Sequence, residues 1–139
     1  MKTFFFITLL ITGTFLKAQT LNTGDKELDQ QLVEQNYQAK LDLNKFTNDL
    51  SIELDVSEEK IKTLLAKKIE PSDVLMIFKI SKIGGRKVEE VEESFQKNKD
   101  KGWGYIAKEM GIKPGSPEFH ELKGKPKKNK KDKSQKKKK

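Results

Sequence analysis

The side chains that most often do chemistry are scarce in this sequence. There is no cysteine, and the single histidine, His120, stands between the carboxylates Glu118 and Glu121. A metal site needs three or four converging ligands, and one imidazole does not supply them. No serine has the context of a nucleophile elbow, and no pair of carboxylates stands out from the polar helix faces as a hydrolytic pair. We therefore predict a protein that is not an enzyme, with no metal, no cofactor and no small-molecule substrate.

The densest acidic run consists of Glu89, Glu90, Glu92 and Glu93. Four carboxylates could attract Ca²⁺, but a calcium loop spaces its ligands regularly around a turn glycine, and this run has neither feature. Glutamates followed by lysines instead suit the start and the end of a helix dipole. The run therefore predicts a solvated helix face.

The clearest binding feature is the C-terminal tail, residues 123–139, with eleven lysines and one aspartate. The tail has no aromatic and no aliphatic residue, so it is predicted to be disordered. A polycation of this kind neutralises phosphates without reading sequence. Two other interpretations stay open, a solubility tail and a tail that folds back on the Glu89–Glu93 face. The lysines predicted to bind an anionic surface or another polyanion are Lys123, Lys125, Lys127, Lys128, Lys130, Lys131, Lys133, Lys136, Lys137, Lys138 and Lys139.

Residues 1–18 have the pattern of a secretory signal peptide. Lys2 supplies the charge, and an apolar run of about 13 residues follows it, too short for the roughly 20 residues of a membrane span. Ala18 precedes a cleavage site at Gln19, although Leu16 is larger than the small residue preferred there. We predict export to the periplasm, the cell surface or the medium, and an uncleaved anchor is the alternative.

Charge divides the chain. The whole sequence has net charge +8, residues 123–139 carry +10, and residues 19–122 carry −4. The high isoelectric point therefore belongs to the tail, and the rest of the exported chain has no electrostatic reason to bind nucleic acid.

Apolar spacing predicts an all-α fold, a small bundle of about five helices after the signal peptide. Residues 19–54 are expected to form a long N-terminal helix, because apolar positions from near Asp25 to near Leu54 follow steps of three and four. The polar Gln35 and the small Ala39 interrupt this row of apolar side chains, so another helix would pair with it only loosely. We expect this helix to project from the body or to pair with a partner protein.

Residues 55–122 are predicted to form a compact helical domain. Ser72 is expected to cap a helix that is apolar on nearly every side over residues 74–83 and stops at Gly84-Gly85. This pattern predicts a central buried helix, and a buried strand is the alternative for its first residues. Another helix is expected over residues 86–97.

The only tryptophan begins a short helical stripe. Ile106, Ala107 and Met110 follow Trp103 at helical spacing, and Gly111 stands where a left-handed residue ends a helix. The glycines on either side of Trp103 indicate that another backbone or helix comes close. We predict that Trp103 is buried with Phe78, Ile106 and Phe95 in a core corner.

The same corner is also typical of the first helix and turn of a DNA-binding helix-turn-helix. Pro114, Gly115 and Pro117 then fall where a recognition helix should start. A nucleic-acid-binding module that combines this corner with the basic tail is therefore the alternative function.

The run Trp103-Gly104-Tyr105-Ile106-Ala107-Lys108-Glu109-Met110-Gly111 resembles the Trp-Gly-x-Ile-Ala-Lys-x-x-Gly motif of small exported bacterial helical proteins of unknown function. The resemblance extends over about residues 54–122, half of the chain, where a helix pair, a glycine turn and a glutamate-bearing helix precede the motif. It implies a helical fold, and it carries over no catalytic residue. The long first helix and the tail lie outside it.

These features predict an exported structural or interaction protein. Its helical body would bind a protein, in particular through the N-terminal helix, and its tail would bind an anionic surface.

Overall fold

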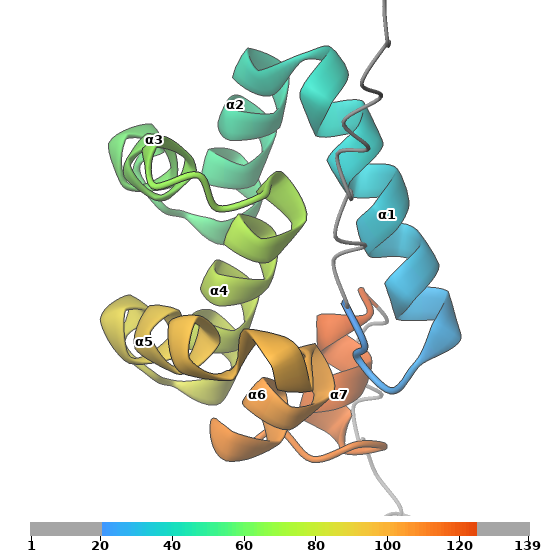
Figure 1. The fold of residues 1–139 in the computed structure, drawn as a ribbon. Helices are drawn as coiled ribbons and strands as arrows, with labels where there is room; N and C mark the ends of the chain where they lie inside the picture. Colours follow the sequence, from blue (N-terminus) through green and yellow to red (C-terminus); the bar gives the residue numbers. More distant parts are fainter. Residues whose placement is uncertain (1–20, 125–139) are drawn as a thin grey trace, which may run out of the picture.

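The computed structural model describes residues 21–124, and its regular structure in this range is entirely helical (Figure 1). The predicted all-α fold is therefore confirmed. More helices are present than expected, partly because the N-terminal helix is divided in two. The helices are α1 (Lys26–Leu41), α2 (Leu43–Leu54), α3 (Glu58–Ala66), α4 (Pro71–Gly84), α5 (Val88–Asn98), the 3-10 turn η1 (Lys99–Lys101), α6 (Trp103–Glu109) and α7 (Pro117–Leu122).

The predicted single helix over residues 19–54 is wrong, because Asp42 separates α1 from α2. Asp42 has an extended backbone, with φ −147° and ψ 90°. Its carboxylate accepts a hydrogen bond from the Lys45 N–H at 2.9 Å and so caps α2, while its own N–H donates to the Gln38 carbonyl at the end of α1. A short acidic side chain that bonds the following backbone favours a helix start over a helix interior.

α1 also does not project from the body. Its side chains Leu28, Leu32 and Ala39 are buried, and α1 packs along α4. The Asn36 side-chain oxygen accepts a hydrogen bond from the Ser72 N–H at 2.8 Å, which ties the middle of α1 to the start of α4. Since α2 packs on α4 as well, the helices on both sides of residue 54 share one core.

The predicted central buried helix is α4. It packs against α1, α2, α3, α5 and α7, and the residues from Val74 to Phe78 are all buried. Its start differs from the prediction. Glu70 occupies the cap position without a side-chain hydrogen bond, Pro71 follows it, and Ser72 lies inside the first turn and is fully buried. Proline at the first helical position fixes the start without a capping side chain.

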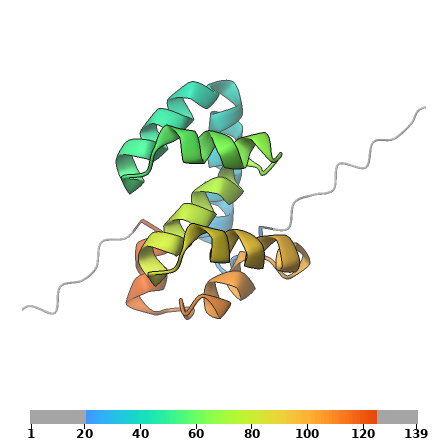
Figure 2. The ribbon, with the colours of Figure 1, turned by 90° about the vertical axis from the view of Figure 1, so that its left-hand side faces the viewer.

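The pair α2–α3 has the same backbone pattern as the pair α4–α5, thirty positions later. The first helix of each pair ends at a left-handed residue, Asp55 or Gly85, and a serine hydroxyl bonds the carbonyl five residues on, Ser51 to Val56 and Ser81 to Arg86. In Figure 2 the first pair lies above the second. Lys67 after α3 forms an ion pair with Glu92 of α5 at 2.7 Å. The body is thus two helical hairpins, with α1 and the C-terminal helices packed on α4 and α5.

Candidate functional site

Trp103, Phe78, Ile106 and Phe95, which we call the Trp103 corner, are part of the hydrophobic core. Trp103 is buried with Phe78 and Ile106, as predicted, and its ring is stacked on Phe95 with centroids 4.9 Å apart and planes 8° apart. The indole N–H donates to the buried Asp73 carboxylate at 2.8 Å. Sequence reasoning missed Asp73, whose neighbours along the chain give no sign that it faces a tryptophan.

The glycines that flank Trp103 hold the start of the folded body. The N–H groups of Trp103 and Gly104 donate to the carbonyls of Leu21 and Asn22, each at 2.9 Å. A Cβ on Gly104 would lie 2.7 Å from the Thr23 carbonyl oxygen, and one on Gly102 would lie 2.7 Å from the Asn22 Cβ. The predicted close approach of another backbone is therefore confirmed. The conspicuous residues of the Trp-Gly motif serve this contact and the core.

In the helix-turn-helix alternative, α7 would take the place of the recognition helix. α6 packs on α5, whereas α7 packs on α4. α7 has only six residues, two of which, Phe119 and Leu122, are buried. Its remaining face carries Glu118 and Glu121, which would repel phosphates.

The metal-binding alternatives find no support in the described part of the chain. Within residues 21–124, no three His, Cys, Asp or Glu side chains gather closely enough to hold a metal ion. His120 is exposed on α7. In the acidic run of α5, Glu92 is paired with Lys67 and Glu93 with Lys97, at 2.7 Å and 2.6 Å.

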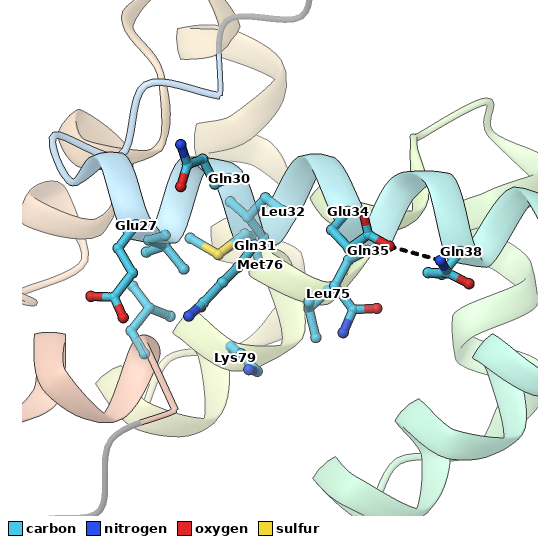
Figure 3. Close-up of a pocket in the computed structure, with 12 residues that line it drawn as sticks. Glu27, Gln30, Gln31, Leu32, Glu34, Gln35, Gln38, Leu75, Met76 and Lys79 are labelled. Atoms are coloured by element: carbon cyan, nitrogen blue, oxygen red, sulfur yellow. Dashed lines mark hydrogen bonds between the residues drawn. The ribbon is translucent and has the colours of Figure 1, made fainter.

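A groove lies between α1 and α4 (Figure 3). It encloses about 510 Å³. Glutamine and glutamate side chains of α1 stand over an apolar floor, and the Gln38 amide donates to the Glu34 carboxylate at 2.7 Å. The lining residues are Glu27, Leu28, Gln30, Gln31, Leu32, Glu34, Gln35, Gln38, Leu75, Met76, Lys79 and Leu122.

The groove adjoins a second hollow of about 290 Å³ between α1 and α2, with which it shares Gln35, Gln38 and Leu75. Lys79 lies between them and pairs with Glu53 of α2 at 3.5 Å. The amides can donate and accept hydrogen bonds, and the leucines supply apolar contact. Such a surface suits contact with a peptide segment. The sequence signal for this groove is the set Gln31, Gln35 and Gln38, which share one side of the helix.

Lys123 belongs to the folded body and not to the tail, which corrects the predicted boundary. Its ammonium contacts the Asp25 carboxylate at 2.7 Å and the Glu27 carboxylate at 3.0 Å, and its side chain is only 9% exposed. The hydrogen bond to Asp25, followed by the one to Glu27, raises the pKa of Lys123. The hydrogen bond from Lys123 likewise lowers the pKa of Asp25, whose other oxygen accepts the Leu28 N–H at 3.0 Å. The charge of Lys123 is thus balanced by two carboxylates of the body, and its binding to a polyanion stays a prediction.

The remaining tail lysines, from Lys125 to Lys139, lie outside the described residues, as does the predicted signal peptide 1–18. The structure fixes the point where the tail leaves the body, next to the N-terminus of α1, because Lys123 is held there. In the described range, no helix combines the length and the apolar character that crossing a bilayer requires.

Comparison with known proteins gives no further identification: no protein-family model, no curated protein and no solved structure matches this chain.

Proposed function

We propose that this chain is an exported, non-enzymatic interaction protein whose helical body carries a lysine tail to an anionic surface. The observation that carries the proposal is the separation of charge along the chain. Residues 21–124 hold 17 basic and 20 acidic side chains, whereas residues 125–139 hold ten lysines and one aspartate. A net charge of +9 in 15 residues attracts anionic surfaces over a distance of about one Debye length, roughly 10 Å at 0.1 M salt.

The ion pairs of Lys123 support this assignment. They anchor the turn after α7 on Asp25 and Glu27, so that the ten following lysines start from a fixed point. The fold also agrees with removal of the signal peptide, since Leu21, a few residues after Ala18, is already buried against the body. The resemblance to small exported helical proteins fits the same proposal, because the motif residues Trp103, Gly104 and Ala107 take structural positions.

The protein partner expected at the N-terminal helix is best accommodated by the groove between α1 and α4. Its amide rim and apolar floor would take an extended or helical peptide segment. Since the chain has no native cysteine, a photo-crosslinker can be placed on Gln31→Cys in the groove and on Ile52→Cys as the control. Adducts of one defined mass at position 31 alone would support the groove, and identical adducts at both positions would not.

The tail is tested by its removal. Deletion of residues 125–139 should abolish sedimentation with anionic vesicles at low salt while it leaves the circular dichroism and the melting temperature unchanged. A chain of the same composition with the tail residues in scrambled order should still bind, because charge density decides the attraction. Binding that survives the deletion would place the site on the helical body and refute the proposal.

A further inference from the structure

Three large apolar side chains of α1 are mostly exposed, and the last of them, Leu41, also borders the hollow between α1 and α2. Val33, Tyr37 and Leu41 are 60%, 60% and 65% exposed, and they succeed one another at steps of four along the helix. Residues at this spacing lie on one face. The buried side chains Leu28 and Leu32 point to the opposite side. We call Val33, Tyr37 and Leu41 the α1 stripe.

The α1 stripe differs from the other exposed apolar residues. Ile52 on α2 and Tyr105 on α6 stand singly, and single exposed hydrophobics are ordinary on a protein surface. α1 also forms one edge of the body in Figure 1, and no other helix covers its outer side there. Leu43, 46% exposed, lies beyond the break at Asp42, where it borders a hollow with Leu65 and Ile69, and it is not part of the stripe.

The stripe and the tail are attached to the same helix. Lys123 binds Asp25, the cap of α1, and Glu27 in its first turn. The 15 residues after Gly124 can span up to about 50 Å when extended, and α1 is about 24 Å long. The tail lysines can therefore reach any surface on which the stripe rests.

An apolar stripe beside a polybasic segment matches the chemistry of an anionic lipid bilayer. Polysaccharide or nucleic acid would satisfy the lysines but would offer nothing to valine and leucine. A bilayer offers anionic headgroups to the lysines, an interfacial zone that tyrosine favours, and acyl chains below. Weak apolar insertion becomes stable anchoring when a polybasic patch is added to it.

We propose that the α1 stripe inserts into the interface of an anionic membrane while residues 125–139 bind the surrounding headgroups. The inference rests on the proposed function of the tail and names its anionic surface as lipid. It places α1 parallel to the membrane plane, with the core side of the helix away from the lipid.

The test uses the chain from Gln19 to Lys139, because residues 1–18 are apolar enough to bind lipid by themselves. Vesicles contain equal parts of phosphatidylglycerol and phosphatidylcholine, with pure phosphatidylcholine for comparison. The stripe variant carries Val33→Ser, Tyr37→Ser and Leu41→Ser, and the matched control carries Ile52→Ser, which changes a side chain that is 74% exposed. All four positions are exposed, so circular dichroism should remain unchanged.

The stripe variant should need about tenfold to a hundredfold more anionic lipid for half-maximal binding, and Ile52→Ser should bind like the unaltered chain. At about 1 M salt, where the Debye length is about 3 Å, both chains should lose their binding, because apolar insertion of the stripe is weak without the attraction of the tail. An environment-sensitive dye on Tyr37→Cys should shift its emission to the blue with anionic vesicles, whereas the same dye on Ile52→Cys should not.

Equal binding of the stripe variant and the unaltered chain at low salt, with no shift at position 37, would overturn the inference and leave the tail proposal standing. Stripe-dependent binding that persists after deletion of residues 125–139 would overturn both the tail proposal and the inference, which rests on it. A lipid-free dimer that becomes monomeric in the stripe variant would assign the stripe to a second copy of the chain and would also overturn the inference.

Discussion

Gly104→Ala is expected to destabilise the protein although it improves a helix. Gly104 lies in α6, and alanine in a helix is more stable than glycine by about 0.5–1 kcal/mol. Propensity alone therefore predicts a gain. The structure opposes it, because the added Cβ would lie 2.7 Å from the carbonyl oxygen and 2.9 Å from the carbonyl carbon of Thr23. Both are backbone atoms, so no side-chain rotation relieves the contact.

The magnitude follows from the two ways in which the clash can be relieved. If residues 21–23 stay in place, overpacking costs about 1–3 kcal/mol. If they leave, the buried Leu21 is exposed at a cost of about 1.5–3 kcal/mol, and two backbone hydrogen bonds are lost. After subtraction of the helix gain, a net loss of about 1–2 kcal/mol remains, and the melting temperature should fall by about 5–15 °C.

The assay is thermal unfolding of Gly104→Ala in two backgrounds, the chain from Gln19 and the chain from Gly24. In the shorter background the atoms that clash are absent, so the same substitution should raise the melting temperature slightly. An equal loss in both backgrounds would show that the clash lies elsewhere in α6. A gain in the longer chain would refute the docking of residues 21–23 on the Trp103 corner.

Three further results are expected. Trp103→Ala should cost about 3–5 kcal/mol in unfolding free energy, measured by urea denaturation, since it removes the largest buried side chain and its stack on Phe95; a variant as stable as the parent would contradict this. Truncation after Leu122 should lower the melting temperature, whereas truncation after Gly124 should not, because only the former removes Lys123; equal melting of the two would refute the anchor. Lys123 lowers the pKa of Asp25 from its ordinary 3.8, so the stabilisation from the ion pair is lost as the pH falls through the lowered pKa. The pKa of Lys123 is raised from its ordinary 10.5, so the same stabilisation is lost as the pH rises through the raised pKa. The melting-temperature difference between the parent and Lys123→Met should therefore be widest between pH 3.8 and 10.5 and should close on either side; a difference independent of pH would exclude the ion pairs as its cause.

The helical core could be predicted from the sequence where the apolar pattern decided it alone. The residues around Phe78 are apolar on nearly every side, and that pattern is typical of a helix at the centre of a bundle. The break at Asp42 could not be predicted in this way. The apolar steps continue across it, and neither glycine nor proline marks it. A single aspartate that caps one helix and ends another is visible only in the backbone geometry.

The repetition of helical hairpins was also hidden. Its left-handed position is Asp55 in the first hairpin and Gly85 in the second. Val56 and Arg86 donate their N–H groups to the carbonyls of Ser51 and Ser81, five residues earlier, and yet their side chains have different chemistry. The two hairpins thus share backbone conformation and buried positions, and these tolerate different side chains. Residue identity therefore does not reveal the repeat, because the two hairpins are alike in backbone conformation and not in side chains.

The Lys123 ion pairs were missed because composition groups this lysine with the ten that follow it. A run of like charge predicts solvent exposure. Lys123, however, directly follows the last residue of α7, and the end of this helix places it against Asp25. Asp25 and Glu27 stand nearly a hundred residues earlier, so no local pattern connects them to it. The first described residues are held by the backbone of α6, whereas Lys123, near the last described residue, is held by the first turn of α1. Any force on the tail from a bound surface would therefore act first on the N-terminal turn of α1.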